Sequence, residues 1–463
     1  MTERIQAEPV DAEDDPGGGA DPGWFARVRG LTGIRAFTVL WVGQLASSIG
    51  TRMTNFVLGI WVWQETGQAS ALALLTFFAF GATVVCSPLA GSLVDRLSRR
   101  LTIMLSDIGS AVATGLMLLI FVTGHAQLWE LIITNTLTGG FLAFQYPAYG
   151  ATIAAMMPKE QYPKANGMMS LVRSMPAIFG PVLAGLLLRL VSLSTVLAVD
   201  TLCYVFAIGT VFLVALPTVR RGEQHRESSL WRDWTAGLRY ILPRRGLTGL
   251  LVLNVVVSLT SAMGFIVLIP MILERTGNNQ FQLGVVQSIG AIGGVCGALA
   301  LTSLRTPRRK MPVIISGILV FSVLGQIGVA VSGTIVLWSV AWFFAWLAVP
   351  FVEGYSQSIW QQKVPSGLQG RVFATTQLFE NLALPIGFAI SGPVVDHLFT
   401  PGMKPGGGLA AVFGGLIGTG PGAGMALIFL LSGALGAGCA LACTLIGTIR
   451  GVDTRIPDAD QTT

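Results

Sequence analysis

Charged side chains are scarce in this sequence: Asp, Glu, Lys and Arg together make up 11% of its 463 residues. Ordinary water-soluble domains contain about 25% of these residues, so the composition excludes a typical soluble globular protein. Apolar residues make up 52% of the chain, which also excludes a largely disordered protein. The composition therefore favours a membrane protein.

Several kinds of chemical site are missing as well. The three histidines lie far apart and the five cysteines all lie in apolar runs, so we expect neither a metal site nor a disulfide framework. The sequence Gly-x-x-x-x-Gly-Lys-[Ser/Thr] is absent, which excludes ATP hydrolysis by that motif. Without a histidine cluster or a nucleophile elbow, an enzyme is disfavoured. We expect no catalytic residue, no metal and no cofactor.

Apolar runs dominate what remains, and each is long enough to cross the roughly 30 Å hydrocarbon layer of a bilayer as a helix. They predict an all-α polytopic membrane protein with twelve transmembrane helices. The predicted crossings are residues 37–63, 70–92, 101–123, 128–151, 166–188, 194–217, 247–272, 281–304, 311–331, 335–358, 371–398 and 422–448. The Gly- and Pro-rich segment 401–424 is expected to form an external loop.

The second six runs repeat the first six at a shift of about 210 residues. Residues 65–67 align with residues 275–277. Three polar positions of the first run, Gln44, Ser48 and Thr51, align with Asn254, Ser258 and Ser261. Six helices in each copy make the copies parallel, as in transporter halves related by an axis along the membrane normal. The predicted parts are an acidic disordered tail with a basic juxtamembrane segment (1–35), an N-terminal half (36–217), a linker (218–246), a C-terminal half (247–449) and a tail (450–463).

Basic residues fall almost entirely on one side of this predicted topology. Of the 29 Lys and Arg residues, 24 lie on the side that holds both termini and the linker, and three lie on the other side. Cytoplasmic loops carry such an excess, so we expect a plasma-membrane protein with both termini in the cytoplasm. The net charge of +6 then reports orientation, and we expect no nucleic-acid partner.

The linker contains apolar side chains at three- and four-residue spacing over residues 230–242, among them Trp231, Trp234, Leu238 and Ile241. This spacing predicts an amphipathic helix that lies at the inner membrane surface and connects the halves. A calmodulin-like partner site is the alternative explanation of the same pattern.

The segment Gly91–Arg100, Gly-Ser-Leu-Val-Asp-Arg-Leu-Ser-Arg-Arg, resembles the loop signature of the major facilitator superfamily, Gly-x-Leu-x-Asp-Arg-x-x-Arg-Arg. Together with the two six-helix copies, the resemblance covers essentially the whole chain. It implies a conformational gate in which Asp95 meets the partly positive N-terminal end of a helix in the other half. The other gate residues would be Gly91, Arg96, Arg99 and Arg100. A purely topogenic role of the arginines is the alternative, and it does not explain Gly91 or Asp95.

Further segments resemble the bacterial efflux branch of this superfamily, which includes macrolide efflux pumps and enterobactin exporters. These segments are residues 44–50, 63–67, 87–95, 356–365 and 369–373. The resemblance implies proton-coupled export of a small hydrophobic or amphipathic molecule, driven by the proton gradient. We expect the chain to be a monomer. An importer or uniporter of the same fold, and a non-transporting membrane sensor or scaffold, are the alternatives.

Gly180, Pro181 and Gly185 also resemble part of the antiporter motif Gly-x-x-x-Gly-Pro-x-x-Gly-Gly. The chain departs from that motif at Pro176 and Ala184, where the pattern has glycine. Because proline removes a backbone hydrogen bond and glycine permits close approach, we expect an antiporter-like hinge between the halves. Ordinary tight packing of two helices would explain the same residues.

Ionisable residues inside the predicted helices are candidate functional groups, because a charge at bilayer depth needs a partner or a watery cavity. Glu353 and Glu380 are the first candidates for a proton site, and Asp107 and Asp200 are further candidates that look more structural. In the superfamily, helices 1, 4, 7 and 10 line the central cavity, so the resemblance implies a substrate-binding set there. This set is Gln44, Ser48, Thr51, Arg52, Asn55, Gln145, Tyr146, Asn254, Ser258, Ser261 and Tyr355.

Overall fold

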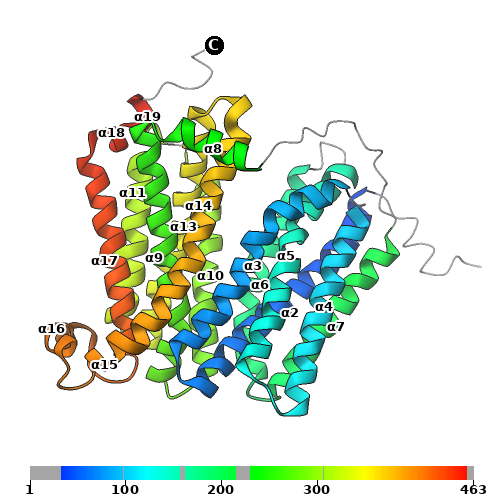
Figure 1. Ribbon diagram of the computed structural model, residues 1–463, viewed down its shortest axis with the longest axis horizontal. Helices are drawn as coiled ribbons and strands as arrows, with labels where there is room; N and C mark the ends of the chain where they lie inside the picture. Colours follow the sequence, from blue (N-terminus) through cyan, green and yellow to red (C-terminus); the bar gives the residue numbers. More distant parts are fainter. Residues whose placement is uncertain (1–32, 97–98, 157–161, 215–229, 306, 456–463) are drawn as a thin grey trace, which may run out of the picture.

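The computed structural model describes residues 33–96, 99–156, 162–214, 230–305 and 307–455, and throughout these ranges the folded elements are helices. Figure 1 shows long helices gathered in two groups that stand side by side. The acidic tail up to residue 32, part of the linker (218–229) and residues 456–463 lie outside the described residues.

Residues 33–213 supply the first group, which we call the N-terminal group. Its helices are α2 (Gly33–Thr66), α3 (Ala69–Arg96), α4 (Arg99–Thr123), α5 (Leu128–Met156), α6 (Tyr162–Leu187) and α7 (Leu193–Leu213). These helices pack mainly on one another, with α2 against α6 and α7, and with α5 against α3 and α4. Most of them extend a few residues beyond the predicted crossings, because backbone hydrogen bonding continues past the apolar run.

Residues 245–445 supply the second group, the C-terminal group. Its long helices are α9 (Arg245–Arg275), α10 (Gln280–Ser303), α13 (Ile335–Lys363), α14 (Ser366–Val394) and α17 (Ala423–Leu445). A further crossing is assembled from α11 (Met311–Leu319), the π-helix η2 (Val320–Ile327) and α12 (Gly328–Val331). The π-helix η3 (Val395–Phe399) and α15 (Thr400–Gly402) continue α14.

Short helices lie at the two ends of the C-terminal group. Figure 1 shows α8 (Leu230–Ile241), α18 (Gly447–Arg450) and α19 (Val452–Arg455) at one end, and α15 and α16 (Gly408–Ile417) at the other. We call these the α8 end and the α16 end. The residues expected to form the linker helix form α8, which packs on α14. The expectation that 401–424 is only a loop is wrong, because residues 408–417 are apolar enough to form α16.

Ten helical segments of the described chain are long and apolar enough to cross a membrane. Helices α2 and α5 are not among these ten, although they are 34 and 29 residues long. The chain is therefore an all-α, multi-pass membrane protein. Twelve crossings stay a prediction, which the lengths of α2 and α5 favour.

The aligned segments 65–67 and 275–277 form the same turn at the ends of α2 and α9. Gly67 and Gly277 adopt positive φ angles of 60° and 62°, which glycine tolerates without strain. The threonine before each glycine, Thr66 or Thr276, donates a 2.6 Å hydrogen bond to the carbonyl four residues earlier. The sequence repeat is thus also a repeat of local structure.

The two groups contact each other mainly along two pairs of helices, α3 with α14 and α6 with α10, and α3 also touches α9. In both pairs the close contacts described below involve the ends of the helices that lie toward the α16 end. A further contact joins α2 to α9, because a Cβ atom on Gly59 would lie 2.9 Å from Ile269 Cδ1. Gly59 and Ile269 are equivalent at the shift of 210 residues.

Candidate functional site

A buried polar cluster joins three helices of the N-terminal group. Gln44 of α2 donates through Nε2 to Asp107 Oδ2 at 2.8 Å. Gln145 of α5 donates through Nε2 to Asp107 Oδ1 at 3.1 Å and to Gln44 Oε1 at 2.9 Å. Asp107 of α4 is 0% exposed, so both of its oxygens are satisfied by amides inside the group. The cluster connects α2, α4 and α5.

Asp200 of α7 is the second buried carboxylate of this group, at 1% exposure. Thr54 Oγ1 donates to Asp200 Oδ2 at 2.7 Å, and nearby the hydroxyls of Thr51 and Tyr204 are 2.7 Å apart. A Cβ atom on Gly50 would lie 2.5 Å from Asp200 Oδ1, so glycine is needed here for α2 to approach α7. Asp200 therefore connects α7 to α2.

Two members of this buried network were missed by the sequence analysis. Ser47 and Thr54 are buried on the same side of α2 as Gln44 and Thr51. The spacing of three, four and three residues along 44, 47, 51 and 54 places all four on one helix face. That spacing is the signal that could have identified them.

The adjoining face of α2 points toward the C-terminal group. Arg52 and Asn55 are exposed and Ser48 is half-buried. Gly59 lies on the same face, at spacings of four and seven residues from Asn55 and Arg52, and contacts Ile269 of α9. The structure thus divides the set expected on this helix: Ser48, Arg52 and Asn55 lie on the more exposed face that also carries Gly59, whereas Gln44 and Thr51 are buried within their own group.

A second polar cluster lies in the C-terminal group. Asn254 of α9 donates through Nδ2 to Glu380 Oε1 of α14 at 3.0 Å, and its Oδ1 accepts from Ser356 Oγ of α13 at 3.3 Å. Glu380 is half-buried and Glu353 of α13 is exposed, so both carboxylates are less buried than that of Asp107. As in the N-terminal cluster, a side-chain amide donates a hydrogen bond to a carboxylate, but here the carboxylate is partly exposed.

The other expected cavity residues of the C-terminal group are half-buried or buried. Ser258 and Ser261 of α9 are half-buried. Tyr355 is buried at 7% exposure, and its ring lies 6.5 Å from that of Phe351, so it packs in the core of this group. The side chain of Tyr146 lies outside the described residues.

The gate segment is described only in part. Gly91, Asp95 and Arg96 belong to the last two turns of α3, and Arg99 begins α4, but the side chains of these four lie outside the described residues. Arg100 is described: its Nη2 donates to the carbonyl of Phe212 at 3.2 Å, and its guanidinium lies 5.6 Å from the centre of that ring. Arg100 thus anchors the start of α4 to the end of α7.

The antiporter-like segment of α6 lies where the two groups meet. A Cβ atom on Gly185 would be 2.9 Å from the carbonyl oxygen of Gln280, and one on Gly284 of α10 would be 2.6 Å from that of Pro181. Glycine is therefore required on both helices for their backbones to pack. Gly180 instead faces α2, where its Cβ would lie 2.7 Å from Arg52 Cβ.

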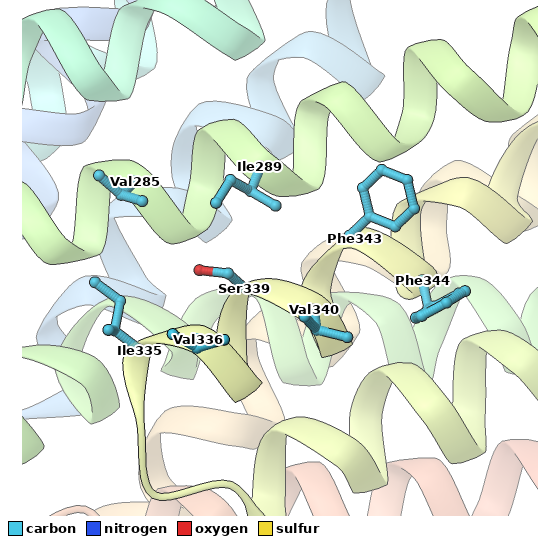
Figure 2. Close-up of a pocket in the computed structure, with 8 residues that line it drawn as sticks. All are labelled: Val285, Ile289, Ile335, Val336, Ser339, Val340, Phe343 and Phe344. Atoms are coloured by element: carbon cyan, nitrogen blue, oxygen red, sulfur yellow. The ribbon is translucent and has the colours of Figure 1, made fainter.

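An apolar pocket of about 510 Å³ lies between α10 and α13 (Figure 2). Its lining residues are Val285 and Ile289 of α10, with Ile335, Val336, Ser339, Val340, Phe343 and Phe344 of α13. Ser339 is the one polar residue of this lining. The pocket can hold an apolar group, but its walls offer nothing that would recognise a charge.

Comparison with known proteins gives consistent relatives. Macrolide efflux protein A of Streptococcus pyogenes is 25% identical over 421 residues, which cover 90% of this chain and 98% of the relative. The Multidrug resistance protein MdtG of Proteus mirabilis is 30% identical over 38% of this chain and 44% of the relative.

Solved structures show the same fold at low sequence identity. A bacterial homologue of the iron transporter ferroportin in an inward-facing state matches with a TM-score of 0.66 at 12% identity, covering 91% of this chain and 99% of that one. The nucleoside transporter NupG matches with a TM-score of 0.61 at 13% identity, covering 88% and 98%. The model of the Major Facilitator Superfamily matches residues 40–388, well over half of the sequence, and the chain therefore belongs to this superfamily.

Proposed function

We propose that this chain is a proton-coupled exporter that moves a small hydrophobic or amphipathic molecule, such as a macrolide, out of the cell. As a member of the superfamily it is a non-enzymatic membrane transporter of small molecules. The observation that carries the export direction and the substrate class is the similarity to Macrolide efflux protein A along 90% of this chain. The efflux-like segments of the sequence support the same assignment.

The contacts between the two groups support transport by alternating access. They gather toward the α16 end, so rocking of the groups about these contacts can open or close the space between them at the α8 end. The excess of basic residues assigns the α8 end to the cytoplasm of the cell, with both chain termini on that side. A monomer contains both groups and suffices for this motion.

We assign the substrate path to the facing sides of α2, α9, α13 and α14. Ser48, Arg52 and Asn55 face it from one group, and Asn254, Ser258 and Ser261 supply polar groups from the other. Glu353 and Glu380 are the coupling residues that can exchange protons with this space, because they are the more open carboxylates. Asp107 and Asp200 would contribute indirectly, by holding α2 in place beside the path.

Erythromycin accumulation in inside-out membrane vesicles tests this proposal. An imposed pH gradient, acidic inside, should drive labelled erythromycin into vesicles that contain the chain, and a protonophore should abolish the uptake. The Asp95→Asn variant, inserted at the same level, should lose most of this uptake if the gate assignment is correct. Drug susceptibility and metabolite-export profiles, with and without the chain, extend the test beyond macrolides.

Each alternative predicts a different outcome. Uptake that proceeds only into right-side-out vesicles identifies an importer, and equilibration that ignores the gradient identifies a uniporter. A chain that moves no compound of the panel in either orientation would be a sensor or scaffold, and the exporter assignment would then be abandoned.

A further inference from the structure

One carboxylate outside the polar clusters joins the two groups directly. Asp396 of η3, in the C-terminal group, accepts hydrogen bonds from the backbone amides of Ala69 and Ser70, which begin α3 in the N-terminal group. The distances are 3.1 Å to Oδ1 and 2.7 Å to Oδ2. The first amides of a helix have no acceptor within the helix, and they form its partly positive end. Asp396 therefore caps a helix that belongs to the other group.

The surrounding packing brings the carboxylate within reach of these amides. Gly392 lies one turn before Asp396, and a Cβ atom there would be 2.5 Å from Ser70 Cα and 2.8 Å from Ala73 Cβ. Two turns before Asp396, Phe388 meets Phe80 of α3 edge-on with ring centres 5.4 Å apart. Residues 388, 392 and 396 recur every fourth position, so they form one stripe that faces α3.

These contacts also fix the direction and register of the α3–α14 pair. Residue 70 meets 392 and 396, and residue 80 meets 388, so the two helices run antiparallel. The C-terminal end of α3 and the N-terminal end of α14 therefore both lie toward the α8 end.

We propose that Asp396 is a latch that holds the two groups together at the α16 end, and that this latch is released when the groups rock so as to close the α8 end. The proposal rests on the alternating access proposed above. Since α3 and α14 belong to groups that rock against each other, tightening one end of the pair loosens the other. Asp396 is therefore a positioning residue that favours the conformation open toward the α8 end.

Hydrogen exchange measured by mass spectrometry, on the full chain in lipid nanodiscs without substrate, tests the latch. In the Asp396→Asn variant the amides at the start of α3 should exchange at least about tenfold faster, because a hydrogen bond to a charged acceptor is worth more than one factor of ten in an equilibrium constant. The ends of α3 and α14 at the α8 end should exchange more slowly, since that end closes more often.

Two further variants complete the experiment. Glu65→Gln removes an exposed acid from the end of α2, close in sequence to the start of α3, and should leave both ends unchanged. Asp396→Glu keeps the charge and should restore most of the wild-type pattern, which also reveals whether the Asn variant merely unfolds. Faster exchange at the start of α3 without any change at the α8 end would mean that Asp396 only caps α3 locally, and this result would contradict the latch proposal.

This measurement separates the latch from the transported molecule. If erythromycin is not moved by the chain but both ends respond to Asp396→Asn in opposite directions, the latch holds and the substrate assignment fails. If erythromycin is exported but neither end responds, the latch fails and the exporter assignment holds.

Discussion

Helix α2 is the first helix of the N-terminal group, and α9 is the first long helix of the C-terminal group. Each carries a side-chain amide at an equivalent position that donates a hydrogen bond to a carboxylate, but the two carboxylates differ in how deeply they are buried. Gln44 donates a hydrogen bond to Asp107, which is 0% exposed and accepts a second hydrogen bond from the amide of Gln145. Asn254 binds Glu380, which is half-buried and has the exposed Glu353 in the same group. The amides occupy equivalent positions, whereas the carboxylate that accepts from each lies on the third helix of the N-terminal group and on the fifth helix of the C-terminal group.

This difference separates two roles for a carboxylate inside a membrane protein. A carboxylate that is enclosed and bonded through both oxygens fixes the positions of helices, and its removal leaves unsatisfied donors behind. A carboxylate that reaches an open space can take up a proton or meet a substrate. We therefore expect variants of the N-terminal cluster to lose stability first and variants of the C-terminal cluster to lose transport first.

The largest expected effect is the loss of stability in Asp107→Leu. This change strands the buried amide donors of Gln44 and Gln145, which should lower the free energy of unfolding by about 2–4 kcal/mol. Unfolding in mixed detergent micelles, followed by tryptophan fluorescence, measures it. The matched variant in the other group, Glu380→Leu, should lower stability by less than about 1 kcal/mol. Equal losses in the two variants would remove the distinction between the clusters.

Transport should respond in the opposite order. The double variant Glu353→Gln and Glu380→Gln should lose gradient-driven erythromycin uptake at least about tenfold, because neutral amides cannot carry a proton. Its stability should change by less than about 1 kcal/mol, since the new amide oxygen at position 380 could still accept from Asn254. Undiminished coupling in this double variant would remove both glutamates as coupling residues.

How far the sequence predicts such sites depends on sequence separation. The helices can be predicted from continuous apolar runs, and the equivalence of Gln44 and Asn254 can be predicted from the sequence repeat. Their partners could not be predicted, because Asp107 lies 63 residues from Gln44 and Glu380 lies 126 residues from Asn254. Asp396 stands beside a Gly- and Pro-rich segment, 326 residues from Ser70, and nothing in its local pattern marks a contact between the halves.

At the contact between α6 and α10, we expect the same substitution in either group to have a similar effect on transport. Gly284→Ala and Gly185→Ala each place a methyl group within 3 Å of a carbonyl oxygen of the other group, so both should slow transport several-fold. Gly209→Ala is the matched control, because no atom lies within 4 Å of its added Cβ. This control should be neutral or more stable by about 0.5–1 kcal/mol, since alanine favours a helix. If only one of the first two glycine variants slowed transport, close packing would be required on that helix alone.

The smallest effect is expected for Ser356→Ala in α13, the fourth long crossing of the C-terminal group, as α5 is the fourth of the N-terminal group. The change removes one hydrogen bond of 3.3 Å to Asn254 and should lower stability by about 0.5–1.5 kcal/mol, with erythromycin uptake within about threefold of wild type. Its effect on stability should add to that of Glu380→Gln within about 0.5 kcal/mol, because the bond from Asn254 to residue 380 survives. The N-terminal counterpart, Gln145→Leu with Asp107→Leu, should couple by more than about 1 kcal/mol, because Gln145 bonds both Gln44 and Asp107. Equal coupling energies in the two pairs of variants would mean that the hydrogen bonds of the C-terminal cluster depend on one another as strongly as those of the N-terminal cluster. Exposure alone would then distinguish their carboxylates.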